Sequence, residues 1–171
     1  MGMETLWAPW RMEFIKDCGK EQDGCFLCRA GRDANARRDL VVRRGVTAFA
    51  MLNRYPYNNG HLLISPVRHE GRIEALTAEE LAEIMALTVE AKQALDRLMG
   101  PHGYNVGANL GRAAGAGVEA HFHMHVVPRW SGDTNFMTAV GSTKVIPQSL
   151  DELWSLLGAE WAAMKGGAKP C

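Results

Sequence analysis

The strongest periodic pattern in the chain begins after Thr77. Between residues 81 and 98, apolar side chains recur at intervals of three and four positions, which places them on one side of an α-helix. Thr77 and Glu80 have the spacing of a capping box, in which each side chain binds a backbone amide of the first turn. The Gly-Pro pair at 100–101 ends the pattern. We therefore predict one long amphipathic helix from Thr77 to Gly100.

A second helix is predicted from about Leu150. Ser149 and Glu152 repeat the capping-box spacing, and apolar residues follow at helical intervals. Short apolar runs bounded by turn-forming residues predict strands instead. The predicted strands are 40–44, 46–52, 61–66, 104–110 and a last one around the histidines at 121–125. Residues 16–39 are polar and rich in Gly, Asp and Arg, and we interpret them as a loop around a cysteine pair.

These elements predict an α+β fold. We expect an antiparallel sheet of about five strands, with the long helix packed on one face and an additional C-terminal helix. The chain has 171 residues, which is the size of one domain. Within this single globular domain we distinguish an N-terminal segment (1–39), a core (40–140), and a C-terminal helix and tail (141–171).

Charge and hydropathy exclude several classes of protein. Lys and Arg total 19, as do Asp and Glu, so the formal charge is 19 − 19 = 0. A neutral chain argues against a protein that mainly binds nucleic acid, but it is compatible with one small nucleotide. No run approaches the ~20 apolar residues of a membrane helix. Residues 1–15 lack the apolar core of a secretion signal. We expect a cytoplasmic protein with neither a nucleic-acid nor a membrane partner.

The chain has four cysteines, which we do not interpret as a disulfide framework because the cytoplasm is reducing. Cys25 and Cys28 form a Cys-x-x-Cys pair, whereas Cys18 and Cys171 stand apart. From the residues alone, this pair is metal-binding, redox-active or incidental.

The most informative segment is His-Phe-His-Met-His-Val-Val-Pro at 121–128. Its alternation is typical of a β-strand and places His121, His123 and His125 on one face; a solvent-facing polar strip is the simplest alternative. On a strand His121 and His125 are about 13 Å apart, whereas a metal–nitrogen bond is about 2 Å. This disfavours a hydrolase that binds one catalytic ion with all three. At least one histidine is therefore available as a nucleophile or as a hydrogen-bond donor to a phosphate.

A glycine-rich segment, Gly111 to Gly117, directly precedes these histidines. Glycines let backbone amides converge on an anion, although a flexible hairpin loop is the simplest alternative. The segment is not a P-loop, since no Gly-Lys-Ser/Thr follows, and not a Rossmann turn, since it leads into a strand. A phosphate-binding loop beside histidines indicates attack on a phosphoryl group by a histidine.

The run HFHMHVV resembles the His-φ-His-φ-His-φ-φ signature of the histidine triad superfamily of nucleotide hydrolases and transferases. FAMLNRYPYNNGHLLISP resembles its strand–turn–strand with a ribose-binding residue, and NLGRAAGAG resembles its phosphate loop. LWAPWRMEFI and PRWSGDTNFM are similar to the branch of bacterial diadenosine tetraphosphate phosphorylases. The resemblance covers about residues 6–137. It implies a HIT-like fold and an enzyme that acts on the α-phosphate of nucleoside polyphosphates, such as diadenosine polyphosphates, by hydrolysis or phosphorolysis.

The resemblance also implies roles for individual residues. The middle histidine, His123, would attack the α-phosphorus and form a nucleotidyl-histidine, and His125 would donate to phosphate oxygens; His121 completes the catalytic triad. His61 matches a fourth family histidine that supports the triad, with an ordinary strand-end histidine as the alternative. The implied substrate-binding residues are Asn53 at the ribose, Asn109, Gly115 and Gly117 at the phosphates, His61, and Met51 and Leu63 beside the base, although a core role explains Met51 and Leu63 equally well.

One departure from the family concerns the leaving group. Many members have Ser, Thr or Gln between the glycine loop and the triad, where this chain has Ala116, Gly117 and Val118. We therefore expect a preference for good leaving groups such as polyphosphates over amines, or weak catalysis. A nucleotide-binding or zinc-stabilised interaction protein with vestigial catalysis is the alternative function.

A metal and an oligomeric state are also implied by resemblance. Cys25 and Cys28 precede the core as in galactose-1-phosphate uridylyltransferase, a relative in which two cysteines and two histidines hold zinc. The corresponding histidines here would be His69 and His121, giving a closed structural Zn²⁺ site; a redox dithiol is the alternative. The family usually forms dimers, so we expect a homodimer, with an edge strand or the Trp-Ala-Pro-Trp segment at 7–10 as its contact; tryptophans buried within one chain explain this segment equally well.

Overall fold

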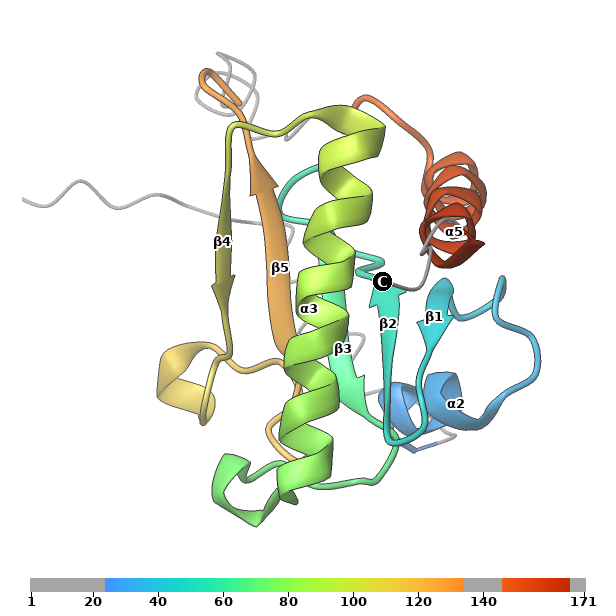
Figure 1. Ribbon diagram of the computed structural model, residues 1–171. Coiled ribbons are helices and arrows are strands. Elements are labelled where there is room, and N and C mark those ends of the chain that lie inside the picture. The colour runs from blue at the N-terminus through green and yellow to red at the C-terminus, as the bar shows by residue number, and fades with distance from the viewer. Residues whose placement is uncertain (1–23, 134–145, 167–171) are drawn as a thin grey trace, which may run out of the picture.

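Five strands and three α-helices form from the residues that the structure, a computed structural model, describes: 24–133 and 146–166 (Figure 1). Neighbouring strands are all antiparallel and follow the order β1-β2-β3-β5-β4. The predicted α+β class and five-stranded sheet are confirmed. The strands are β1 (Val41–Arg44), β2 (Ala48–Leu52), β3 (Leu62–Pro66), β4 (Gly103–Gly107) and β5 (Met124–Arg129), and the helices are α2 (Phe26–Arg32), α3 (Ala78–Met99) and α5 (Leu150–Gly166), with short 3-10 helices η1 (Ile73–Ala75) and η2 (Arg112–Ala114).

The long helix α3 lies where the sequence predicts it. Thr77 Oγ1 accepts the backbone N–H of Glu80 at 3.2 Å, and the Glu80 carboxylate accepts the N–H of Thr77 at 2.9 Å, so the capping box is present. Gly100 ends the helix in the left-handed conformation that glycine adopts without strain. Figure 1 shows α3 crossing one face of the sheet over its central strands.

Both faces of the central sheet are covered. Successive residues of β2 face opposite sides of the sheet. Ala50 and Leu52 belong to the core beneath α3, whereas Phe49 and Met51 belong to a second cluster with α2. Every residue of β2 and β3 is buried as a result. This explains why their sequences are continuous apolar runs instead of alternating ones.

The C-terminal helix α5 packs beside α3 and covers the β1 edge of the sheet (Figure 1). The indole Nε1 of Trp154 donates to the backbone oxygen of Val41 on β1 at 2.8 Å. The indole of Trp161 is buried and donates to Glu90 of α3, also at 2.8 Å. At the helix start, the N–H of Glu152 donates to Ser149 Oγ, as the predicted cap requires. The opposite edge of the sheet is β4.

Three expectations require correction. The predicted loop at 16–39 contains a helix, α2, because its apolar stripe is too short to show a period and its end is held from outside: Arg44 donates to the backbone oxygens of Gly31 and Asp33. The histidine strand β5 begins only at Met124, and β4 ends at Gly107, before the predicted 110. The 7–10 segment lies outside the described residues. No helix in the described part of the chain has the length and apolar character needed to span a membrane.

Candidate active site and metal centre

His123 is held as a neutral imidazole. Its Nδ1 lies 2.9 Å from the backbone oxygen of His121. A carbonyl oxygen only accepts hydrogen bonds, so Nδ1 has the proton and Nε2 has the lone pair. The side chain is buried, and this burial lowers the pKa of His123, which favours the uncharged ring. A neutral imidazole with its lone pair on Nε2 is a competent nucleophile.

His125 has its tautomer set by His61. The backbone N–H of Tyr57 donates to His61 Nδ1 at 3.0 Å, so the proton of a neutral His61 is on Nε2. That Nε2 lies 2.9 Å from His125 Nδ1 and donates to it. A neutral His125 therefore has its own proton on Nε2, where it can donate a hydrogen bond. His125 and its neighbour His123 are in edge contact, with ring centroids 5.1 Å apart.

A cavity of about 260 Å³ adjoins the triad. Among its lining residues, His121 and His123 are buried, Asn109 is half-buried, and Ile73 and Leu110 are exposed. The glycine loop forms one wall through Gly111 and Val118; Gly115 and Gly117 lie between them in sequence. Gly111 and Gly115 both have positive φ, at 80° and 85°, which explains why glycine occupies these positions.

The remaining predicted substrate residues lie on the sheet face that also presents His125. Met51 pairs with Leu63, and Leu63 pairs with His125, so their side chains point to the same side. Met51 and Leu63 are buried in the cluster beneath α2. Asn53 follows β2; its Oδ1 accepts the N–H of Tyr55, and its Nδ2 lies 3.3 Å from His61 Nδ1.

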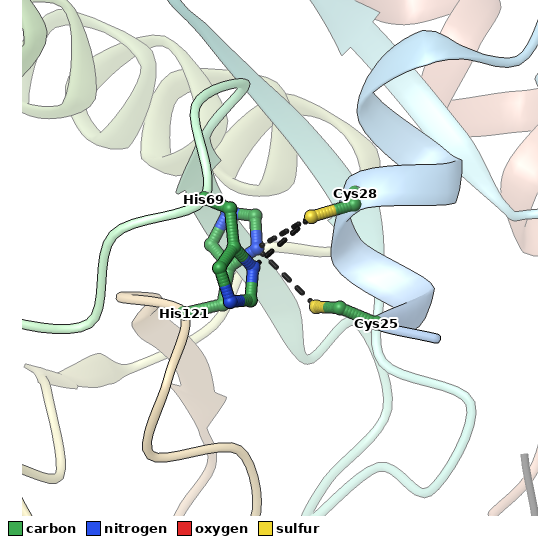
Figure 2. Close-up of side chains that lie close together, drawn as sticks. All are labelled: Cys25, Cys28, His69 and His121. Atoms are coloured by element: carbon green, nitrogen blue, oxygen red, sulfur yellow. Dashed lines mark hydrogen bonds between the residues drawn. The ribbon is translucent and has the colours of Figure 1, made fainter. Parts of the chain in front are cut away.

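Cys25, Cys28, His69 and His121 converge from three separate segments (Figure 2). The thiols come from α2 and the residue before it, His69 follows β3, and His121 precedes β5. Their ligand atoms all lie within 4.8 Å of one another. Sγ of Cys25 and of Cys28 lie 3.3 and 3.5 Å from His121 Nδ1, and Cys28 Sγ lies 3.1 Å from His69 Nδ1. This group could hold a metal ion.

The chemistry of these side chains fits a tetrahedral ion. Bond lengths of about 2.3 Å to sulfur and 2.0–2.1 Å to nitrogen require S···N separations of about 3.5 Å, close to those observed. His121 Nε2 donates to the backbone oxygen of Pro66 at 2.9 Å, so Nδ1 presents its lone pair to the thiols. Burial lowers the pKa of His121, which favours the neutral ring that a metal ligand requires. Burial and the neighbouring Cys25 raise the pKa of the Cys28 thiol, so ligation would displace its proton.

The group of two cysteines and two histidines shares a wall with the cavity, namely the loop between β3 and α3. The backbone of Gly71 approaches Glu119 so closely that an added Cβ would lie 2.2 Å from the Glu119 oxygen. Next to it, the N–H of Phe122 donates to the Glu70 oxygen at 2.7 Å. Arg68 binds both carboxylate oxygens of Glu80, which fixes this loop to the start of α3. The loop therefore carries both His69 and one wall of the cavity, and it is attached to the triad segment and to the start of α3.

A family model described as "HIT domain" matches residues 36–132 of the chain. The chain belongs to the HIT domain family. It is 42% identical over 166 residues to an AP-4-A phosphorylase of Mycobacterium tuberculosis, covering 94% of this chain and 85% of that protein. An adenosine 5'-monophosphoramidase of Schizosaccharomyces pombe is 29% identical over 132 residues, 75% of this chain and 92% of that one. These two relatives have the names of nucleotide-processing enzymes, and the predicted family is confirmed.

Solved structures agree with the HIT fold. A zinc-bound histidine triad family protein from Mycobacterium smegmatis superposes with a TM-score of 0.67 at 23% identity, covering 85% of this chain and 98% of that one. The predicted HIT-like fold is confirmed by this likeness.

Some residues of the site could not be identified from the sequence. Apart from His69, no residue of the β3–α3 loop was predicted to belong to the site, although Arg72, Ile73 and Glu74 line the cavity. The contribution of Tyr57 comes from its backbone amide, and amides have no signature in a sequence. The isolated apolar residue Ile73 between two charged neighbours was the one available signal for the outer wall.

Proposed function

We propose that this HIT protein transfers a nucleotidyl group from the α-phosphate of a dinucleoside polyphosphate to inorganic phosphate, through His123. The observation that supports this most directly is the buried, neutral His123, whose Nδ1–H is bound to the His121 oxygen beside the cavity. The 42% identity to an AP-4-A phosphorylase supports the choice of substrate and acceptor.

The reaction has two displacements at phosphorus. In the first, the lone pair of His123 Nε2 attacks the α-phosphorus, a P–N bond forms, and the P–O bond to the polyphosphate breaks with its electrons on the departing oxygen. In the second, a phosphate oxygen attacks, the P–N bond breaks, and His123 returns to its neutral form. His125 donates its Nε2–H to a phosphate oxygen and stabilises the charge that develops there. Diadenosine tetraphosphate would give ATP and then ADP.

We propose the substrate contacts that the resemblance to the family implies. Asn53 has its amide oxygen bound to Tyr55, so its NH₂ group is the part that would donate to a ribose hydroxyl. Asn109 and the loop glycines Gly115 and Gly117 would bind the phosphates. Met51 and Leu63 would contact the base in addition to packing in the cluster beneath α2.

The four-residue cluster is proposed as a structural Zn²⁺ site. Cys25, Cys28, His69 and His121 give the two-sulfur, two-nitrogen donor set of closed zinc sites. When bound, the ion would supply a cross-link between α2 and the two loops that flank the cavity. The cytoplasmic location predicted from the sequence would keep both thiols reduced.

A homodimer through the β4 edge is proposed as the functional unit. Val106 on β4 is 49% exposed, and Leu81, Met85 and Val89 form an exposed apolar stripe along α3. An edge strand presents backbone groups that can pair with a second copy, and a contiguous exposed apolar stripe is typical of an interaction surface.

One feature favours the alternative of a nucleotide-binding protein with vestigial catalysis. The segment from Ala116 to Val118 offers no hydroxyl or amide side chain to the leaving group, and Val118 packs against the cluster beneath α2.

The same feature predicts which substrates the enzyme prefers, because general acid assistance to the leaving group is typically worth about 10²–10⁴-fold. Because a polyphosphate leaves as a stabilised anion, it needs this help less than an amine does. We therefore expect higher kcat/KM for diadenosine tetraphosphate than for adenosine 5'-phosphoramidate.

The test follows the products of diadenosine tetraphosphate in phosphate buffer with wild-type protein and with His123→Ala. ADP plus ATP from the wild type indicates phosphorolysis, whereas AMP plus ATP would show that water is the acceptor. The variant should lose turnover by orders of magnitude and still bind AMP. Near-normal turnover by His123→Ala would exclude His123 as the nucleophile, and nucleotide binding without turnover by the wild type would support the vestigial alternative.

A further inference from the structure

Two exposed apolar side chains flank the open part of the cavity beside His123. Ile73 is 38% exposed and lies on the β3–α3 loop, while Leu110 is 51% exposed and directly precedes the glycine loop. Both line the same cavity. Surface apolar residues are unremarkable singly, but two that border one cavity from separate segments form an apolar mouth.

The backbone holds both sides of this mouth in place. Ile73 begins η1, whose turn is closed by the bond from the Leu76 N–H to the Ile73 oxygen at 3.2 Å. Arg68 donates to the oxygen of Ala75 at 2.8 Å and so attaches the end of η1 to β3. Opposite, Leu110 precedes Gly111, at which the chain turns with a φ of 80°. The mouth is therefore formed before any ligand binds, which lowers the entropy lost on binding.

The chemistry of the wall indicates what this mouth would bind. Arg72 lies beside Ile73, and its guanidinium pairs with Glu70 on an exposed surface. Such a cation can contact the phosphates of a departing chain. Glu74 and Glu119 also line the cavity, and carboxylates accept hydrogen bonds from exocyclic amino groups. Glu119 forms an ion pair with Arg112 at 2.9 Å, and this pairing reduces the repulsion between the Glu119 carboxylate and a phosphate.

The size of the cavity restricts the occupant. Its volume of about 260 Å³ is slightly below the range of small-molecule sites, which are roughly 300–1,000 Å³. The buried part is next to His123, where the proposed reaction requires the α-phosphate. The space that remains admits further phosphates, and a planar base attached to them would lie at the mouth, between Ile73 and Leu110.

We propose that Ile73 and Leu110 form a subsite for the base of the leaving nucleotide, with Arg72 beside its phosphates. This subsite makes the enzyme selective for substrates with a nucleoside on both ends of the phosphate chain. The proposal rests on the proposed function, because the leaving group is defined by attack of His123 on the α-phosphate.

The test compares two substrates that differ only in the leaving group. Diadenosine tetraphosphate has a leaving nucleoside, and adenosine 5'-phosphorofluoridate has none. In the double variant Ile73→Ser/Leu110→Ser, the ratio of kcat/KM for the first substrate to that for the second should fall about tenfold, the effect of losing apolar contact on one base. Leu110→Phe preserves the apolar mouth and should keep this ratio within about twofold.

Val46→Ser is the matched control, because Val46 is 90% exposed at the β1–β2 turn and does not line the cavity. Its ratio should equal that of the wild type, and urea unfolding should show that all variants are folded. An unchanged ratio in the double variant, or an equal loss with both substrates, would overturn the subsite and leave His123 as the nucleophile. If the wild type cleaves neither substrate, the proposed function itself is wrong.

Discussion

Replacing His61 by leucine tests whether the tautomer of His125 governs catalysis. His61 is fully buried, accepts the N–H of Tyr57 at 3.0 Å and donates to His125 Nδ1 at 2.9 Å. Leucine has a similar volume but no polar atom, so the variant removes both bonds and leaves little cavity. The proton of His125 can then occupy either ring nitrogen, and the fraction with a proton on Nε2 falls.

The size of the effect follows from these two bonds. A buried polar group that loses its partner costs about 1–3 kcal/mol. The same free energy, when it is lost from the transition state because His125 no longer donates, corresponds to a decrease of roughly 5- to 150-fold in kcat/KM. The free energy of unfolding should fall by about 1–3 kcal/mol as well, because the Tyr57 amide loses this acceptor.

Two measurements and one control variant test whether His61 acts on catalysis through the tautomer of His125. kcat/KM for diadenosine tetraphosphate at saturating phosphate gives the catalytic loss, and urea unfolding gives the stability loss. In His61→Gln, the side-chain oxygen can accept from Tyr57 and the NH₂ group can donate to His125, so most of the activity should remain. If the Leu and Gln variants lose the same activity, the tautomer argument is wrong and only the volume of His61 matters.

Two further outcomes are expected. Protein purified without added metal should contain about one zinc per chain by elemental analysis, and its removal by a chelator should lower the melting temperature by about 5–10 °C; a metal-free protein with an unchanged melting temperature would exclude the site formed by Cys25, Cys28, His69 and His121. Val106→Lys on β4 should convert a dimer to monomers in analytical ultracentrifugation, because it places two like charges at a symmetric interface. A wild-type protein that sediments as a monomer at micromolar concentration would refute the dimer.

Elements with strong local signals were predictable from the sequence. Helix α3 begins at its capping box and ends at Gly100. Thr77, Glu80 and Gly100 determine these ends through backbone groups only a few residues away in the sequence. Strands β2 and β3 have uninterrupted apolar runs because both of their faces are covered. Helix α2 has no such signal, since its seven residues bury only Leu27 and Ala30 and depend on distant contacts from Arg44.

The candidate site was also predictable only where its residues have a local sequence pattern. The histidine spacing identified His123 and His125 as a pair, and the four proposed metal ligands lie together in the structure. A strict strand through His121, however, was wrong: β5 begins at Met124, and the preceding chain is held by bonds to the β3–α3 loop. Those bonds join residues far apart in sequence, so no local pattern could predict the cavity wall at Ile73.

The indole of Trp154 that binds the β1 backbone limits how the protein can assemble. A sheet with two open edges can add copies at both ends and grow into a fibre. Here α5 covers β1, so among the strands described only β4 offers unpaired backbone along an outer edge. Pairing of two β4 strands about a two-fold axis would use that edge in both copies and stop further growth. If the proposed dimer forms through β4, the bond from Trp154 to β1 would therefore keep a third copy from adding to that pair.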